Sequence, residues 1–260
     1  MLDLRLSQSR LAMPSGIIPT YTTTCHECAL NALCLPVSLS EEDIGKLDDI
    51  VGRGRPLQRN QRIYETGDKF GSIYAVRSGA IKVFNIDEAG DEQVIGFYLA
   101  GEIFGLDAIH DQTHESSAKA LETSAICEIP FQKVEELSIR IPNLQSHIYR
   151  MLSKEIHSDQ QLQLLLSKKT AEEKIGTFLL NLSGRYQQRK LSPNSFRLPM
   201  ARTDIGNYLG LAVETVSRVF TRLQKNDVLK VDGKEVSIIN NAELCRVAHA
   251  YAPRPGQISN

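Results

Sequence analysis

Two short amphipathic segments flank a glycine in Arg202-Thr-Asp-Ile-Gly-Asn-Tyr-Leu-Gly-Leu-Ala-Val-Glu-Thr-Val-Ser-Arg-Val-Phe-Thr-Arg-Leu223. Thr203 is placed to cap a first helix that ends at Leu209, and the apolar spacing predicts a second helix over 213–225. Gly206 lets the two helices cross closely, and Gly210 supplies the tight turn between them. Their shared apolar face consists of Ile205, Leu209, Leu211, Val216 and Val219. This pattern predicts a helix-turn-helix.

A hairpin is predicted directly after the second helix, in Val228-Leu-Lys-Val-Asp-Gly-Lys-Glu-Val-Ser-Ile-Ile239, with its turn at Asp232-Gly233. Helices and hairpin together describe a winged helix-turn-helix. The exposed face of the second helix carries a carboxylate, a hydroxyl and a guanidinium, which can recognise cytosine, thymine and guanine in the major groove. We therefore predict that double-stranded DNA is bound by Val213, Glu214, Ser217 and Arg218.

Basic side chains are concentrated in the same part of the chain. Residues 168–240 carry 13 Lys and Arg against 7 Asp and Glu, whereas the other residues carry 17 against 24. The formal net charge of −1 for all 260 residues hides this difference. A basic C-terminal part suits a polyanion, although a merely solvated charged face has the same composition.

The overall composition is that of a globular protein, with 42% hydrophobic and 23% charged residues. No apolar run approaches the roughly 18 residues that a membrane helix needs. The N-terminus mixes charges into its apolar positions and lacks the apolar centre of a signal peptide. We expect a cytoplasmic protein with no membrane partner.

Short β-rich stretches alternate with glycines between about residues 37 and 128. Four of them are Arg62-Ile-Tyr64, Ser72-Ile-Tyr-Ala-Val76, Ala80-Ile-Lys-Val-Phe84 and Gln93-Val-Ile-Gly-Phe-Tyr98. Short strands separated by turn glycines predict an antiparallel barrel or roll. This pattern describes a scaffold and identifies no ligand.

From Ile141 to Leu166 apolar residues recur at helical spacing and predict one long amphipathic helix. Its stripe includes Ile148, Leu152 and Ile156, and the next position of the stripe is Asp159. If the stripe packs on its own copy across a two-fold axis, two Asp159 carboxylates approach each other and oppose association. A slightly tilted helix would instead leave Asp159 at the solvent edge.

Three cysteines form the cluster Cys25-His-Glu-Cys28 and Cys34. In a cytosolic chain such a cluster favours a metal over disulfides, because thiols there stay reduced. Three thiolates are one ligand short of a closed site, and the candidates for the fourth ligand are Cys127, Cys245 and His26. Sulfur ligation fits either a tetrahedral zinc or an iron-sulfur cluster. A lone cysteine in a strand, such as Cys127, is ordinarily a small core residue.

The order of cysteine cluster, glycine-punctuated roll, long helix and winged helix-turn-helix resembles the cyclic AMP receptor protein superfamily. The chain is most similar to its FNR family, the oxygen-sensing fumarate and nitrate reduction regulators, which includes the ANR proteins. The similarity covers nearly the whole chain. Its most specific stretches are the cysteine cluster, Ala120-Leu-Glu-Thr123, Cys127-Glu-Ile-Pro-Phe131, Leu164-Leu-Leu-Ser-Lys-Lys169, Ile205-Gly-Asn-Tyr-Leu-Gly-Leu211 and Val213-Glu-Thr-Val-Ser-Arg218.

The resemblance implies that Cys25, Cys28, Cys34 and Cys127 hold an oxygen-labile 4Fe-4S cluster, which would make Cys127 a ligand and leave Cys245 outside the site. In FNR proteins the intact cluster favours a homodimer. Oxygen converts the cluster to a 2Fe-2S form, and the dimer separates. A like-charge pair at Asp159 would keep dimerisation marginal, so that a modest shift linked to the cluster decides it.

The resemblance also implies a transcription regulator of the anaerobic response. The positions matching Glu214, Ser217 and Arg218 read TTGAT half-sites in a palindrome, which only a dimer spans. A surface loop that matches Ile86-Asp-Glu-Ala-Gly-Asp91 touches RNA polymerase in the family, and Ile86, Gly90 and Asp91 are its candidate contacts here.

One departure from the wider superfamily concerns the ligand of the roll. Cyclic nucleotide binders place a glutamate for the ribose and an arginine for the phosphate in the segment corresponding to residues 105–118. Here Leu106 and Ser116 take these places. Without a fixed positive charge for the phosphate, no cyclic nucleotide is expected.

We predict an α+β chain of five parts. They are a cysteine-rich segment (1–36), an antiparallel β-roll like that of cyclic nucleotide-binding proteins (37–140), a dimerisation helix (141–169), a winged helix-turn-helix domain (170–248) and a tail (249–260). The alternative is a DNA-binding regulator with structural zinc or a thiol switch. A redox enzyme is disfavoured, since the chain has no phosphate-cradling glycine loop and no arranged nucleophile and base.

Overall fold

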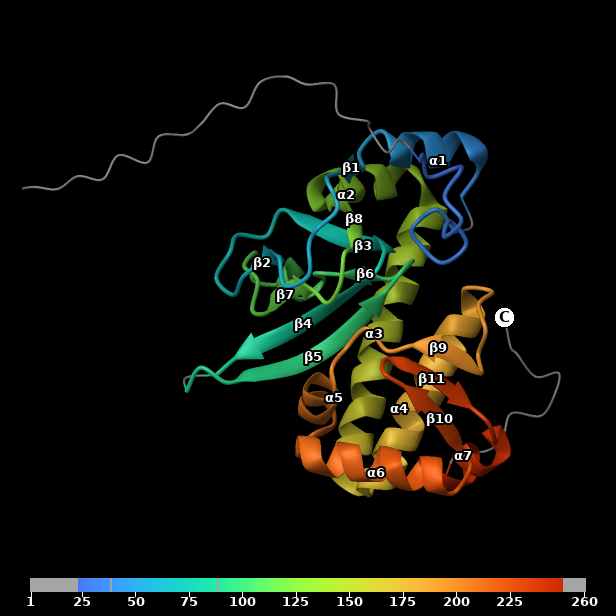
Figure 1. The fold of residues 1–260 in the computed structure, drawn as a ribbon. Helices are drawn as coiled ribbons and strands as arrows, with labels where there is room; N and C mark the ends of the chain where they lie inside the picture. The colour runs from blue at the N-terminus through green and yellow to red at the C-terminus, as the bar shows by residue number, and fades with distance from the viewer. Residues whose placement is uncertain (1–22, 38, 88, 250–260) are drawn as a thin grey trace, which may run out of the picture.

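The computed structural model describes residues 23–37, 39–87 and 89–249. A roll of two antiparallel sheets, a long helix and a C-terminal helical domain with a small sheet follow one another along the chain (Figure 1). The predicted α+β class, with its roll, long helix and winged helix-turn-helix, is thus confirmed. Residues 1–22 of the predicted cysteine-rich segment and 250–260 of the predicted tail lie outside the described residues.

The roll consists of two four-stranded sheets. The first sheet contains, in order, β1 (Gly52–Arg53), β8 (Ala125–Pro130), β3 (Ser72–Ser78) and β6 (Ile103–Phe104). The second sheet contains β2 (Arg62–Tyr64), β7 (Ser117–Ala120), β4 (Ala80–Ile86) and β5 (Glu92–Leu99). A 3-10 turn, η1 (Asp107–Ile109), follows β6. Apolar side chains from both sheets fill the space between them, among them Tyr64, Val76, Ile81, Val83 and Phe104.

A second core lies where helices meet the first sheet. Helix α1 (Glu41–Asp48) begins at Ser40, whose hydroxyl accepts a hydrogen bond from the backbone N–H of Asp43. Helix α2 (Phe131–Arg140) starts directly after β8. The core combines side chains of these helices, the sheet and the loop before α1, including Leu35, Leu47, Ile73, Ile129 and Val134. This packing fixes the loop that carries three of the cysteines.

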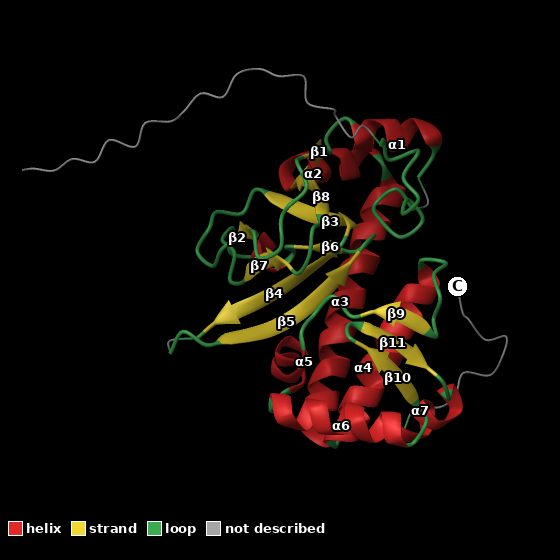
Figure 2. Cartoon of the chain, in the orientation of Figure 1, coloured by secondary structure: helices red, strands yellow, loops and turns green. Residues whose placement is uncertain are grey.

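Helix α3 (Pro142–Lys168) runs past the roll to the C-terminal domain (Figure 2). Pro142 stands at its first turn, where the missing N–H costs no helical hydrogen bond. Leu144 is buried against the second core, but Ile156 is 59% and Leu166 36% exposed. The predicted amphipathic stripe therefore exists, and its part beyond Leu152 is only partly covered in a single chain.

The C-terminal domain contains the predicted helix-turn-helix and hairpin. Its elements are α4 (Ala171–Gln188), β9 (Ser195–Arg197), α5 (Arg202–Leu209), α6 (Val213–Lys225), β10 (Leu229–Asp232), β11 (Glu235–Ile238) and α7 (Asn241–Val247). Helix α6 has the predicted bounds. The predicted cap at Thr203 is wrong, because α5 already begins at Arg202 and the carboxylate of Asp204 accepts from the N–H of Ala201 at 3.0 Å.

Two glycines give the helix-turn-helix its geometry. A Cβ on Gly206 would lie 2.6 Å from the carbonyl oxygen of Leu211, so only glycine lets α5 and the turn approach this closely. Gly210 ends α5 in the left-handed region at φ 61°. Both roles were predicted from the sequence.

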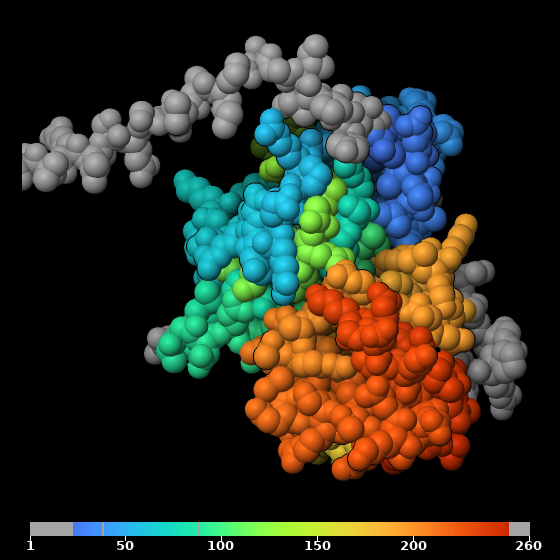
Figure 3. All heavy atoms as spheres, in the orientation of Figure 1, coloured from blue at the N-terminus to red at the C-terminus, as the bar shows by residue number. Residues whose placement is uncertain are grey.

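The largest core extends across the boundary between the roll and the C-terminal domain. Val94, Phe97 and Leu99 of β5 share it with Leu179 of α4 and Leu209 of α5. Figure 3 shows the orange C-terminal residues packed against the teal strands. The helix-turn-helix domain therefore packs on β5 at the edge of the second sheet, which fixes how that domain is oriented.

Candidate functional site

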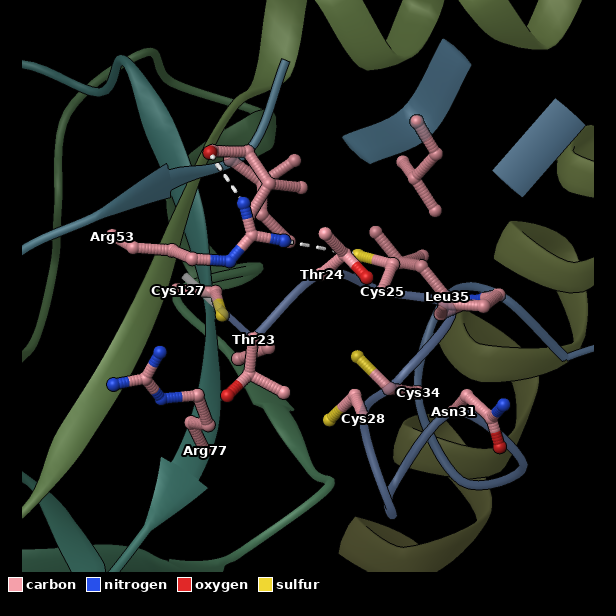
Figure 4. A pocket seen from close by; sticks show the side chains of 15 residues that line it. Thr23, Thr24, Cys25, Cys28, Asn31, Cys34, Leu35, Arg53, Arg77 and Cys127 are labelled. Atoms are coloured by element: carbon pink, nitrogen blue, oxygen red, sulfur yellow. Dashed lines mark hydrogen bonds between the residues drawn. The ribbon is translucent and has the colours of Figure 1, made fainter. Parts of the chain in front are cut away.

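Four of the five cysteines line one cavity (Figure 4). Cys25, Cys28 and Cys34 come from the loop before α1, and Cys127 comes from β8, where it pairs with Arg53 of β1 and Ala75 of β3. The cavity opens to solvent, and its lining is mostly apolar apart from the thiols and two arginines. The fold thus brings a distant strand cysteine to the three clustered ones.

The cysteine loop is shaped by turns and anchored by one apolar side chain. The N–H of Asn31 donates to the carbonyl of Cys28 at 3.0 Å, and the N–H of Cys34 donates to that of Leu30 at 3.1 Å. Leu35 follows Cys34 and is 1% exposed in the second core. Burial of Leu35 therefore holds Cys34 at the edge of the sheet that carries Cys127.

Burial favours the protonated thiol at three of these cysteines, Cys25, Cys34 and Cys127. It raises the pKa of Cys25 to about 12, with a further contribution from the neighbouring carboxylate of Asp48. It also raises the pKa of Cys34 to about 12 and increases that of Cys127. Thiolate is the form that binds metals, so a bound metal centre must displace these protons.

Two guanidinium groups, of Arg53 and Arg77, also line the cavity (Figure 4). Both lower the pKa of Cys127, against the larger effect of burial. The Nε atom of Arg53 is buried and has no hydrogen-bond partner within the described part of the chain. Sequence reasoning missed both arginines, because only the folded sheet brings them next to the cysteines.

The four thiols fit a sulfur-ligated cluster in kind and number, since 4Fe-4S clusters are held by four cysteines. Within residues 23–37, 39–87 and 89–249, no three His, Cys, Asp or Glu side chains lie close enough together to hold a single metal ion. The thiols therefore surround a shared space and do not converge on one point. Of the candidate fourth ligands, only Cys127 is among the described residues lining this cavity.

The other two candidates lie elsewhere. The Nδ1 atom of His26 pairs with the carboxylate of Glu41 at 2.7 Å, which directs the ring to α1. Cys245 is buried in α7, a helix that packs on α4 in the C-terminal domain.

The predicted DNA-contacting residues lie together at the start of α6. Glu214, Ser217 and Arg218 are exposed, and Val213 is partly buried. The side chains of Glu214, Ser217 and Arg218 leave the helix away from its buried face. That face consists of Val216, Val219, Phe220 and Leu223. One guanidinium nitrogen of Arg218 donates to the hydroxyl of Thr215 at 3.1 Å. Three exposed polar side chains are therefore available near the N-terminus of α6, the part of a recognition helix that makes major-groove contacts.

The predicted dimerisation residues follow one face of α3. Ile148 and Leu152 are partly buried, whereas Ile156 and Asp159 are exposed. The solvent-edge placement of Asp159 is thus what a single chain shows, and partial burial still raises the pKa of its carboxyl.

A second cavity lies between α3 and the roll, at the place where Leu106 and Ser116 were compared with nucleotide-binding residues. Three carboxylates, of Asp107, Glu155 and Asp159, line it together with the rings of Tyr64, Tyr98 and Phe104. Its described lining includes no Lys or Arg. Negative charge of this kind repels a phosphate.

The candidate polymerase loop forms the tip of the β4–β5 hairpin (Figure 1). The carboxylate of Asp87 accepts hydrogen bonds from the N–H groups of Ala89 and Asp91, both at 2.9 Å. Gly90 has a φ of 88°, and Ile86 is 45% exposed. In the described part of this loop Asp87 bonds to the backbone of Ala89 and Asp91, and Ile86 presents an apolar side chain to solvent.

Comparison with known proteins connects these sites to a family. Residues 54–140 match the cyclic nucleotide-binding domain, and residues 198–229 match the crp family of bacterial regulatory proteins. The transcriptional activator protein anr of Pseudomonas aeruginosa is 54% identical over 224 residues, which cover 86% of this chain and 92% of that protein. This chain belongs to the FNR family of the CRP/FNR superfamily. As a member of the FNR family it is a DNA-binding transcription regulator and not an enzyme.

Further relatives agree with the FNR assignment. The fumarate and nitrate reduction regulatory protein of Escherichia coli is 50% identical over 224 residues, covering 86% of this chain and 90% of that protein. The structure of FixK2 from Bradyrhizobium japonicum has a TM-score of 0.71 and 27% identity, covering 78% of this chain and all of that one. Among the described residues of this FNR-family regulator, no helix is long and apolar enough to span a membrane.

Proposed function

We propose that this FNR-family regulator controls the anaerobic response through an oxygen-labile 4Fe-4S cluster held by Cys25, Cys28, Cys34 and Cys127. One observation carries the proposal: four thiols from two distant chain segments line a single cavity. When bound, the cluster would supply oxygen sensitivity, since oxygen converts it to a 2Fe-2S form. The thiols need a reducing compartment, so we place the protein in the cytoplasm.

The exposed stripe of α3 supports a homodimer as the DNA-binding form. Ile156 is 59% and Leu166 36% exposed, and a second copy would cover them. The carboxylate of Asp159 opposes this association and keeps it close to balance. A small free-energy change caused by gain or loss of the cluster at the cysteine cavity would then shift the population between monomer and dimer.

Glu214, Ser217 and Arg218 are proposed to read TTGAT half-sites of a palindrome. Arg218 suits the guanine, and Glu214 suits the cytosine opposite it. A monomer reaches one half-site only, so separation of the dimer lowers affinity. Ile86, Gly90 and Asp91, at the tip of the β4–β5 hairpin, are the proposed contacts to RNA polymerase. The acidic second cavity supports the absence of a cyclic nucleotide.

The deciding experiment is a visible absorption spectrum with iron and sulfide assays on protein purified without oxygen, followed by timed exposure to air. We expect a broad absorption band that bleaches as the protein becomes monomeric by sedimentation. A colourless protein that contains zinc and binds DNA equally in air would reject the iron-sulfur proposal and leave the zinc or thiol-switch regulator.

The chain offers a matched pair of variants for the same assay. Cys127→Ala should lose iron and visible absorbance while staying soluble, because it removes the ligand supplied by β8. Cys245→Ala removes a buried cysteine of the C-terminal domain and should keep both signals. Equal iron content in the two variants would exclude Cys127 from the ligand set.

A further inference from the structure

Arg53 connects the two chain segments that carry the cysteines. It lies on β1 directly opposite Cys127 of β8. Its Nη2 atom reaches the cysteine loop and donates to the sulfur of Cys25 at 3.4 Å (Figure 4). One side chain therefore touches the loop cysteine while its backbone is paired with the strand cysteine.

Asp48 at the end of α1 holds this arginine in place. Its Oδ1 atom accepts a hydrogen bond from the backbone N–H of Cys25 at 2.7 Å and from the Nη2 atom of Arg53. The two side chains are only 21% and 17% exposed, so the ion pair is well shielded from water. Asp48 and Arg53 together fasten Cys25 to both α1 and β1.

The Nε donor of Arg53 has no partner among the residues that the structure describes. Nη1 donates to the carbonyl of Val51 at 3.4 Å, but Nε is buried without a hydrogen bond. A buried N–H without an acceptor is unfavourable. Because Arg53 lines the thiol cavity, a thiolate or sulfide bound there would offer the missing acceptor.

We propose that Arg53, held by Asp48, is a positioning residue that fixes Cys25 beside Cys127 and stabilises the negative charge of a sulfur-ligated centre. The charge-stabilising role of Arg53 rests on the proposed function, whereas its positioning of Cys25 does not. Four thiolates give the assembled centre a net negative charge, and a shielded guanidinium offsets it. Groups that orient metal ligands in this way strongly affect metal retention.

The test compares Arg53→Met, Arg53→Lys and Asp48→Asn with the control Arg55→Met, which changes an exposed arginine two residues along the chain. The first readout is the rate at which a ferrous chelator removes iron from protein kept without oxygen. We expect Arg53→Met to release iron roughly tenfold faster and Asp48→Asn to be intermediate. Arg53→Lys keeps the positive charge but lacks the several N–H donors of the planar guanidinium, so its iron release should lie between that of Arg53→Met and the wild type. Arg55→Met should match the wild type.

The second readout needs no cluster. In iron-free protein, hydrogen exchange of the loop 23–37 should be roughly tenfold faster in Arg53→Met and Asp48→Asn. These variants lose hydrogen bonds that Arg53 and Asp48 make to Cys25. Unchanged exchange together with unchanged iron release would overturn the inference. A wild-type protein without any iron-sulfur cluster would reject the proposed function and the charge-stabilising role with it. The exchange measurement would then still decide whether Arg53 and Asp48 hold the loop.

Discussion

Lys82 of β4 and Asp204 of α5 form an ion pair with 2.6 Å between Nζ and Oδ1, although they are 122 residues apart. The lysine side chain is only 5% exposed and also pairs with Glu92 of β5 at 2.7 Å. Asn207 of α5 adds hydrogen bonds to the backbone of Glu92 and Val94. The first helix of the helix-turn-helix is therefore bound to the hairpin that carries the proposed polymerase loop.

Lys82→Met should destabilise the chain by about 2 kcal/mol, because it leaves the shielded carboxylate of Asp204 without its cation. Urea unfolding followed by circular dichroism measures this change. The control is Lys46→Met, which breaks surface pairs with Glu42 and Asp43 within α1 and should leave stability nearly unchanged. Equal effects of the two variants would contradict a structural role for the Lys82–Asp204 pair.

Glu102 should make stability depend on acid pH. Burial acts to raise its pKa, but the guanidinium groups of Arg185 and Arg189 outweigh burial and hold the pKa below its usual 4.5. A carboxyl whose pKa is lowered by folding contributes its full stabilisation above about pH 4.5, the usual pKa of the unfolded chain. This stabilisation is lost as the pH falls through the lower pKa of the folded state. Glu102→Gln should therefore reduce the free energy of unfolding at neutral pH, and its difference from the wild type should shrink below pH 4.5.

Urea unfolding at several pH values measures this dependence. The exposed carboxylate of Glu115 provides the control, since Glu115→Gln should follow the wild type at every pH. A difference between Glu102→Gln and the wild type that stays constant down to pH 3 would show that the ion pairs of Glu102 do not cause it.

Asp159→Ala should strengthen dimerisation of the iron-free protein in air by roughly tenfold, since it removes the proposed repulsion between two carboxylates. Sedimentation equilibrium gives the dimer dissociation constant directly. Ser158→Ala changes the neighbouring exposed residue and should have no effect. An unchanged monomer fraction in Asp159→Ala would remove Asp159 from the dimer contact.

Arg218→Ala should relax the preference at the guanine of the half-site, at a cost of about 1–3 kcal/mol in discrimination. Fluorescence anisotropy with TTGAT duplexes and single-base variants measures it on protein prepared without oxygen. Lys225→Ala, at the far end of α6, should instead weaken binding to all duplexes equally and reduce the salt dependence. Retained guanine preference in Arg218→Ala would refute its role.

Gly206→Ala should destabilise the helix-turn-helix by about 2 kcal/mol, because its Cβ would meet the carbonyl of Leu211 at 2.6 Å. Gly184→Ala provides the opposite case within α4, where a Cβ has no neighbour within 4 Å. It should stabilise the chain by about 0.5–1 kcal/mol, as alanine does at an open helical site. Thermal unfolding of both variants tests this contrast, and equal melting temperatures would contradict it.

Local features of the fold could be predicted because they depend on neighbours within a few residues. The bounds of α6, the turn at Gly210 and the hairpin at Asp232-Gly233 follow from apolar spacing and from backbone conformations that glycine favours. The helix cap was predicted at Thr203, two residues too late. The N-cap is Ala201, because its backbone N–H donates to the carboxylate of Asp204. The loop cysteines and the exposed face of α6 were recognisable in the same local way.

Contacts between distant segments were decided only when the whole chain packed. No periodicity in the chain places Arg53 beside Cys25, joins Lys82 to Asp204, or extends one core from β5 into α5. Cys127 itself was recognised through family resemblance, and its strand position alone indicated an ordinary core residue. Local conformation depends on a few neighbouring residues, whereas these contacts depend on how every sheet and helix buries its apolar face against the others.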